Sequence, residues 1–216
     1  MGILSRRKQS VVKIPKEIVY DLSEETLTHL ITKDLAKKWT YPIYVDLSPP
    51  QFLVSDVKAL SILKADSVKE INLRANKITK IEDELQPFIK LKRLNLSQNE
   101  LRSVELLSHI HLVHLDLSQN MLGPIPPDLS MCQSLEYLNL SYNSLRMHCS
   151  DDEKNSSGVN HTFARTIGKC TQLKELNMGY NQLEWNKADL TEIFNVLKNF
   201  KKLQSIYFLC NPFGTK

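Results

Sequence analysis

The chain has 216 residues, of which 42% are hydrophobic and 24% are charged, and its formal net charge is +4. Residues 1–16 contain five Lys or Arg and no acid, so this segment carries +5 and the remainder carries −1. The remainder therefore offers no net positive field for nucleic acid. No run of 18 apolar residues and no secretory signal is present, which predicts a cytoplasmic protein, with cytoskeletal, ciliary or nuclear sites as alternatives.

Residues 1–20 are predicted to be a flexible basic arm by their composition. Gly2 followed by basic residues resembles the start of an N-myristoylated protein, although Arg6 stands where that motif has Ser or Thr. Membrane attachment is therefore expected only if Gly2 is acylated, since an acyl chain and a polybasic segment together can anchor a protein.

Residues 21–66 are predicted to be an N-terminal cap. Ser23 can cap a helix whose apolar residues recur at helical spacing. These apolar residues are Leu27, Leu30, Ile31 and Leu35. Val45, Leu47 and Phe52 then have the spacing of a degenerate copy of the pattern that follows. A cap is expected because the terminal units of a repeat array must cover the end of its core.

Six segments fit the pattern LxxLxLxxNxL, whose places are numbered here as positions 1 to 11. They begin at Val68, Leu91, Leu112, Leu135, Leu173 and Leu203. Each has asparagine at position 9, and these asparagines are Asn76, Asn99, Asn120, Asn143, Asn181 and Asn211. Positions 4 and 6 point to one face of a short strand, so stacked copies join their leucines into one core. The asparagine carboxamide is predicted to donate to and accept from turn backbone in a structural role.

This pattern resembles the leucine-rich repeat family over residues 68–213. The resemblance implies an α/β solenoid, a horseshoe with a parallel concave β-sheet. It has six clear repeats, a degenerate N-terminal repeat and a helical N-cap. The early repeats are similar to the phosphatase-regulator-like subclass, which is typically intracellular. The interval between the last two ladder asparagines contains the amphipathic segment KADLTEIFNVLKNF, and the last repeat is similar to the ribonuclease-inhibitor-like subclass.

The repeats, residues 67–216, are spaced unevenly. Successive ladder asparagines are 23, 21, 23, 38 and 30 residues apart. The longest interval holds a polar, glycine-containing stretch, which predicts a loop insertion at about 146–161. Such a loop is either a binding appendage or a tolerated spacer, and the sequence leaves both open.

Catalytic and metal-site signatures are absent from the sequence, which predicts a protein that is not an enzyme and needs no cofactor or metal. Two imidazoles and two thiols gather at His148, Cys149, His161 and Cys170, but their spacing fits no familiar zinc site. Cys132 and Cys170 each precede a position 1 residue by three places, as Phe88 and Phe200 do. These thiols are therefore expected in the core.

The concave face is where this family usually binds its partners. The candidate partner-binding residues are Arg93, His114, Tyr137, Tyr142, Tyr180 and Tyr207. The four tyrosines are expected to form an aromatic strip in the later repeats, where tyrosine would bury a large area on a partner. The alternative is that they only pack on cross-strand neighbours.

The resemblance implies a non-catalytic adaptor that binds protein partners on its concave face. Similar small arrays act as phosphatase regulators or as axonemal and other ciliary subunits. Another alternative is a ribonucleoprotein subunit, although the concave face lacks a basic stripe, so no direct nucleic-acid contact is expected. The last repeat is followed by no helix or polar cap in this sequence, so its edge is expected to dock another chain or to be covered by further residues.

Overall fold

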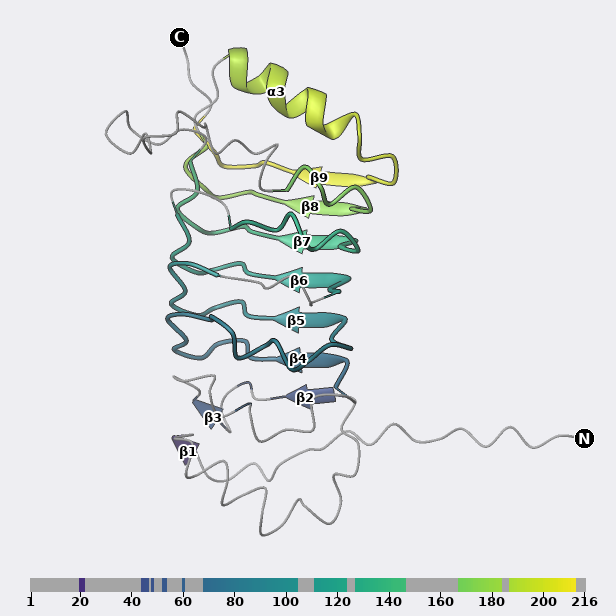
Figure 1. The fold of residues 1–216 in the computed structure, drawn as a ribbon. Helices are drawn as coiled ribbons and strands as arrows, with labels where there is room; N and C mark the ends of the chain where they lie inside the picture. Colours follow the sequence, from purple (N-terminus) through teal and green to yellow (C-terminus); the bar gives the residue numbers. More distant parts are fainter. Residues whose placement is uncertain are drawn as a thin grey trace, which may run out of the picture.

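A computed structural model describes residues 20–21, 44–46, 48, 52–53, 60, 68–104, 111–123, 127–146, 167–183 and 187–212. Seven short strands form one sheet in the order β2-β4-β5-β6-β7-β8-β9, and every neighbouring pair is parallel. The strands are β2 (Tyr44–Asp46), β4 (Glu70–Asn72), β5 (Arg93–Asn95), β6 (His114–Asp116), β7 (Tyr137–Asn139), β8 (Glu175–Asn177) and β9 (Ser205–Tyr207). Figure 1 shows them stacked along one axis, as the predicted solenoid requires.

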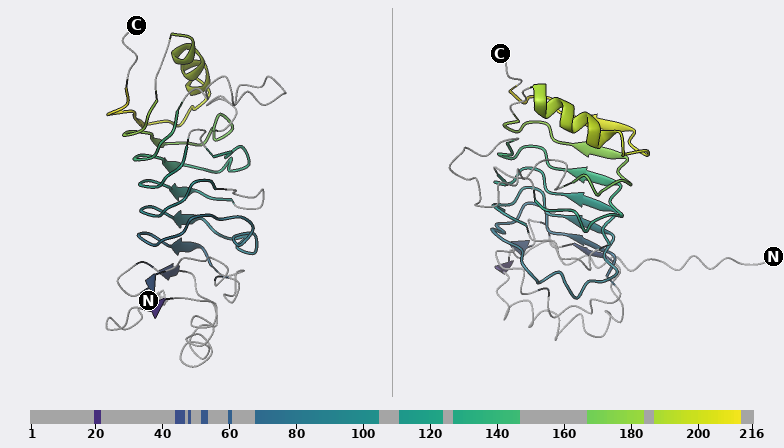
Figure 2. Two further views of the ribbon diagram at one scale, coloured as in Figure 1. Left: turned by 90° about the vertical axis from the view of Figure 1, so that its left-hand side faces the viewer. Right: turned by 45° about the horizontal axis from the view of Figure 1, so that its top comes forward.

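Each strand of β4 to β9 covers positions 3 to 5 of one repeat. In β4 to β8 the position 4 residue is buried and the residues on either side are half-buried or exposed. This alternation follows from the period of two in an extended chain. In Figure 2 the strands line one side of the stack, and the connecting segments return along the other.

The leucine positions form a continuous core, as the repeat pattern predicts. Positions 1, 4, 6 and 11 of the first five repeats are all buried, with at most 2% of each side chain exposed. Leu138, for example, lies between Leu115 and Leu176 in strand register and is fully buried. The predicted position of the thiols is also confirmed, because Cys132 and Cys170 are buried in the same core as Phe88 and Phe200.

The asparagine ladder has the structural role that the sequence predicts. Asn99 Nδ2 donates to the carbonyl of Leu96 in its own repeat (3.0 Å) and to that of Leu73 in the preceding repeat (2.9 Å). Its Oδ1 accepts from the backbone N–H of Ile78, again in the preceding repeat (3.1 Å). Equivalent bonds recur at the other ladder positions Asn120, Asn143, Asn181 and Asn211. Each of these five amides therefore joins two successive repeats.

The N-terminal region is only partly described. β1 (Tyr20–Asp21) pairs in parallel with β3 (Phe52–Leu53) in a separate two-stranded sheet. Val45 of β2 pairs with Ile71, which places it at position 4 of the expected degenerate repeat. The predicted helix after Ser23, Leu47 and most of the arm lie outside the described residues, so the boundary between 1–20 and 21–66 stays a prediction.

The segment between the last two repeat strands contains helix α3 (Lys187–Leu197), which lies beside β9 at the C-terminal end of the stack (Figure 1). The predicted amphipathic helix is thus present, with Ile193 and Val196 buried. Phe194 is 59% exposed, so it lies outside the apolar face that Ile193 and Val196 share. No helix within the described ranges is long and apolar enough to cross a membrane.

The end of the sheet is less well covered than its middle. β9 pairs with β8 on one side and forms the end of the strand order. Leu203, Ile206 and Phe208 are only partly buried, whereas the equivalent residues of inner repeats are buried. This agrees with the expectation of a partly exposed edge, and its docking to another chain stays a prediction.

Candidate functional site

The strand face is defined here as the solvent side of β4 to β9, where the side chains of positions 3 and 5 project. Parallel pairing in register places the position 3 residues in one column across the sheet. In order, this column is Glu70, Arg93, His114, Tyr137, Glu175 and Ser205. Three candidate residues therefore lie side by side at its centre.

The centre of the column is an aromatic stack. The rings of His114 and Tyr137 lie 4.0 Å apart with an interplanar angle of 8°. On the β5 side of the stack, Arg93 Nε lies 3.6 Å from Glu70 Oε1 in an exposed ion pair. On the β8 side, the next residue of the column is Glu175.

Burial and neighbouring charges shift both ring pKa values. Burial lowers the pKa of His114, and the positive charge of Arg93 lowers it further. Burial raises the pKa of Tyr137, and the carboxylates of Asp116 and Glu175 raise it further. The strand face thus favours a neutral imidazole and a neutral phenol at its centre.

The position 5 column is structural in β4 to β8. Asp116 Oδ1 accepts from the backbone N–H (2.9 Å) and the hydroxyl (2.6 Å) of Ser118. Asn95 and Asn139 make the same pair of bonds to the serine two residues further on. These Asx turns hold the chain as it leaves each strand. They are a role that the sequence reading missed, although the recurring Asn-Leu-Ser and Asp-Leu-Ser triplets signal it.

Position 8 forms a second column beside the strand face, with an unusual backbone. All six residues there have positive φ although none is glycine. They are Ala75 (59°), Gln98 (58°), Gln119 (55°), Tyr142 (55°), Tyr180 (53°) and Cys210 (57°). Each N–H of the first five donates to the position 7 carbonyl of the next repeat, as Tyr142 N does to Gly179 O (3.0 Å). The left-handed turn therefore sets the side chains of this column apart from those of the strands.

Tyr142 and Tyr180 stack within the position 8 column. Their rings lie 4.1 Å apart with an interplanar angle of 7°. Hydrogen bonds with Cys210 and then with Tyr142 raise the pKa of Tyr180 to about 12. The two side chains remain 49% and 42% exposed, so the stack presents a large aromatic surface to solvent.

The expected strip of four tyrosines is thus divided between columns. Tyr137 stacks on His114, Tyr142 stacks on Tyr180, and Tyr207 lies at position 5 of β9 and is 47% exposed. Both pairs pack on cross-strand neighbours, as the alternative reading predicts. Their exposed area keeps partner binding open as a prediction. The sequence reading did not include Leu209, which is 68% exposed beside the position 8 column.

The remaining candidates can be placed only in part. Cys170 is buried, its thiol donates to Leu129 O (3.3 Å), and burial raises its pKa to about 12. Gly2, His148, Cys149 and His161 lie outside the described residues, as does the loop insertion beyond residue 146. Within the described part of the chain, no three His, Cys, Asp or Glu side chains are grouped so that they could hold a metal ion.

Comparisons with known proteins agree with this architecture. Two family profiles, both described as leucine rich repeat, match residues 66–122 and 134–155. The protein phosphatase 1 regulatory subunit SDS22 of Saccharomyces cerevisiae is 35% identical over 106 residues, which cover 47% of this chain and 31% of that protein. The chain thus spans about a third of the length of this curated relative.

Solved structures share the fold at low sequence identity. Internalin InlF of Listeria monocytogenes superposes with a TM-score of 0.53 at 17% identity, over 80% of this chain and 43% of its own. The Arabidopsis receptor kinase HAESA, solved with the peptide hormone IDA and the co-receptor SERK1, gives 0.57 at 23% identity, over 79% and 26%. With the parallel sheet, the buried leucine positions and the asparagine ladder, these matches show that the chain has a leucine-rich repeat fold, with leucine rich repeats at residues 66–122 and 134–155.

Proposed function

We propose that this chain is a non-catalytic interaction subunit that binds a protein partner across the strand face and the position 8 column. The observation that carries the proposal is the exposure of Tyr142 and Tyr180 in a stack that the sheet holds in place. Tyrosine buries a large area on a partner and loses little rotamer entropy, so it is enriched among the residues that dominate interface energy. Tyr137, His114 and Arg93 extend this surface along the neighbouring column.

A narrower candidate function is regulation of protein phosphatase 1. It is supported by the 35% identity to a yeast protein that bears the name of a regulatory subunit of that enzyme. The matched segment covers about half of this chain, so the similarity applies to a part of the repeat array. A partner of this kind would place the protein in the cytoplasm or the nucleus.

The charges of the strand face support a protein partner over RNA. Arg93 on β5 is the one Lys or Arg at positions 3 and 5 of β4 to β9, whereas Glu70, Asp116 and Glu175 are acids at these positions. A mixed surface of this kind lacks the continuous positive stripe that binds a phosphate backbone. Salt-dependent binding of the purified chain to RNA would favour the ribonucleoprotein alternative instead.

The test is a pair of variants measured against one defined partner and against a native extract. The first variant carries Tyr137→Ala, Tyr142→Ala and Tyr180→Ala. The control carries Ile89→Ala and Met131→Ala, which remove side chains that are 56% and 51% exposed in connecting segments. Binding to the purified catalytic subunit of protein phosphatase 1 is measured by biolayer interferometry, and quantitative mass spectrometry compares the proteins captured by each variant.

The triple variant is expected to weaken partner binding at least about tenfold, whereas the control should bind like the wild type. Thermal transitions of both variants should stay close to that of the wild type, because all five side chains are on the surface or half-buried. If the wild type does not bind the phosphatase, the narrower candidate is excluded. If the triple variant captures the same proteins as the control, the proposal for this face is wrong.

A further inference from the structure

In the position 3 column, the residue that follows the aromatic stack on the β8 side is a carboxylate, Glu175. Its order across β4 to β8 is an acid, a base, two stacked rings and a second acid. Glu70 forms an ion pair with Arg93 at one end of this series. The carboxylate of Glu175, at the other end, makes no ion pair and no hydrogen bond within the residues that the structure describes.

The free face of the Tyr137 ring points toward β8. Its centroid lies only 4.0 Å from that of His114 on β6, and the two rings are within 8° of parallel. At that separation the ring normal must run from strand to strand, so the face opposite His114 is turned toward β8, where position 3 is Glu175. The open face of the Tyr137 ring and the Glu175 carboxylate therefore border the same place on the strand face.

The chain has a cation of its own at the β5 end of the stack. Arg93 lies between Glu70 and the β5 side of the His114 ring, and its positive charge acts on that ring. The β8 side of the stack has the same two elements, an aromatic face and a carboxylate, without a cation of the chain paired to the carboxylate. Lys174, the nearest cation in sequence, pairs instead with Glu136 at 2.8 Å.

Asp116 adds a second negative charge beside this place. Its carboxylate acts on Tyr137 together with that of Glu175, although Asp116 Oδ1 accepts from Ser118 and Oδ2 accepts from Asn139 Nδ2 at 3.5 Å. A cationic ligand would therefore be attracted by both charges, and an acidic ligand would be repelled. The complementary ligand is a planar cation, because a guanidinium stacks on an aromatic face and pairs with a carboxylate at the same time, which an ammonium does less well.

We infer that the β8 end of the His114–Tyr137 stack binds an arginine side chain of the protein partner, stacked on Tyr137 and paired with Glu175. This rests on the proposed function, because it names the chemistry by which the strand face recognises its partner. The guanidinium extends the series of stacked groups by one, and its charge is balanced by Glu175 and Asp116.

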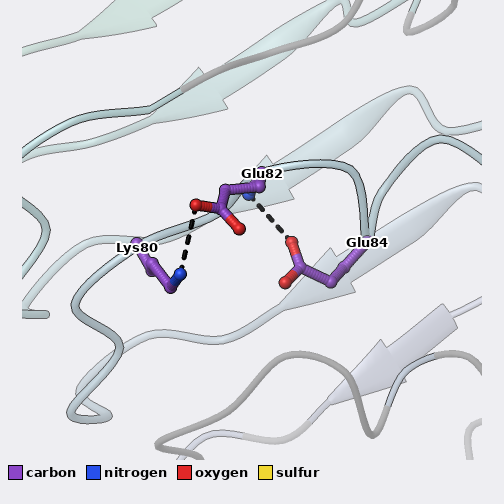
Figure 3. A network of polar contacts seen from close by, with 3 residues as sticks. All are labelled: Lys80, Glu82 and Glu84. Carbon is purple, nitrogen blue, oxygen red and sulfur yellow. Dashed lines mark hydrogen bonds and ion pairs between the residues drawn. The ribbon is translucent and has the colours of Figure 1, made fainter.

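The experiment uses a single side chain as the probe, so it does not depend on knowing the partner. The ¹⁵N-labelled full chain is titrated with Nα-acetyl-arginine N-methylamide into the millimolar range and followed by NMR. The neutral citrulline analogue is the matched ligand control. Glu175→Gln and Tyr137→Leu are the test variants. Glu82→Gln is the matched protein control, since it removes an exposed carboxylate that pairs with Lys80 at 3.1 Å in a connecting segment (Figure 3).

Saturable shift changes are expected at the amides of β7 and β8 with the arginine probe and not with citrulline. Affinity should fall about two- to fivefold in either test variant and stay unchanged in Glu82→Gln. No saturable change at β7 and β8, equal changes with citrulline, or an unchanged response in Glu175→Gln overturns the assignment. These results would leave the proposed function standing, because that is tested separately by the three tyrosine substitutions.

One further variant distinguishes a partner from the chain's own basic segment. If Arg6 or Arg7 filled the place, the variant Arg6→Ala, Arg7→Ala would bind the probe more tightly than the wild type by removing an internal competitor. That result would overturn the assignment to a partner. Equal affinity in this variant and in the wild type supports it.

Discussion

Replacing a single ladder asparagine tests how strongly the amides join neighbouring repeats. Asn143 is buried, and its Nδ2 donates to Leu117 O (3.0 Å) and Leu140 O (3.1 Å). Its Oδ1 accepts from the N–H of Leu122 at 3.0 Å, and no other acceptor for that N–H is present among the described residues. We therefore expect Asn143→Ala to leave the buried Leu122 N–H without a partner.

The size of the expected destabilisation depends on which backbone groups lose their only hydrogen bond in Asn143→Ala. The two carbonyls keep a second donor, because Asn120 also donates to Leu117 O (3.0 Å) and Asn181 to Leu140 O (2.9 Å). The orphaned N–H costs about 1–3 kcal/mol, and the lost bonds to the carbonyls bring the expected loss to about 2–4 kcal/mol of unfolding free energy.

The assay is urea unfolding followed by circular dichroism. The matched control is Asn195→Ala in α3, where the carboxamide is exposed and accepts only from Lys198 Nζ within the described residues (3.2 Å). That substitution should change the free energy by less than about 0.5 kcal/mol. A loss below about 1 kcal/mol for Asn143→Ala would refute the reasoning, because it would mean that water or a shifted turn satisfies the Leu122 N–H.

Three other predictions can be checked on the same apparatus. Ala75→Gly should stabilise the chain by up to about 1 kcal/mol in the same urea titration, because relief of the left-handed strain at φ 59° exceeds the entropy cost of glycine; destabilisation would contradict this. Leu138→Ala should lower the unfolding free energy by about 2–5 kcal/mol, since the side chain is fully buried; a loss below that range would mean that the core collapses around the gap. The lowered pKa of His114 means that the folded state binds fewer protons there, so its contribution is present above the unfolded value of about 6.5 and is lost as pH falls through the folded value. His114→Phe should therefore reduce the loss of melting temperature between pH 7.5 and 5.5, and an unchanged loss would count against it.

The repeat pattern was enough to predict the core. The spacing of the leucines indicates which side chains face inward. Because side chains alternate with a period of two, burying the central residue of a three-residue strand exposes the residues on either side of it. The ladder followed for a similar reason, because a buried carboxamide beside a turn must bond to the backbone there. Cys132 and Cys170 could be placed by analogy with Phe88 and Phe200, since equivalent places in stacked repeats share one environment.

The candidate surface could be predicted only for the strands themselves. Tyr137 lies at position 3, where alternation points it to solvent, and its place beside His114 follows from register. Tyr142 and Tyr180 lie at position 8, after the chain has turned through a left-handed residue. Local pattern does not predict that turn, because position 8 carries Gln, Tyr, Ala or Cys and no glycine to signal positive φ. The division of the tyrosines between two columns therefore required the structure.

From Asn99 onward, the Oδ1 of each ladder asparagine accepts a hydrogen bond from an N–H in the repeat before it, so the array closes in the order of synthesis. Each amide completes the repeat before it, as Asn181 does when its Oδ1 accepts from the N–H of Leu145 at 3.1 Å. During synthesis a repeat leaves the ribosome before the asparagine that closes its turn, which follows 21 to 38 residues behind the previous one. At about 5–20 residues per second that lag lasts roughly one to eight seconds. The N–H of Leu145 has the longest delay before its acceptor, Asn181, is synthesised. A translational pause in the 38-residue interval would therefore leave this turn of the nascent solenoid without its hydrogen bond while the earlier turns already have theirs.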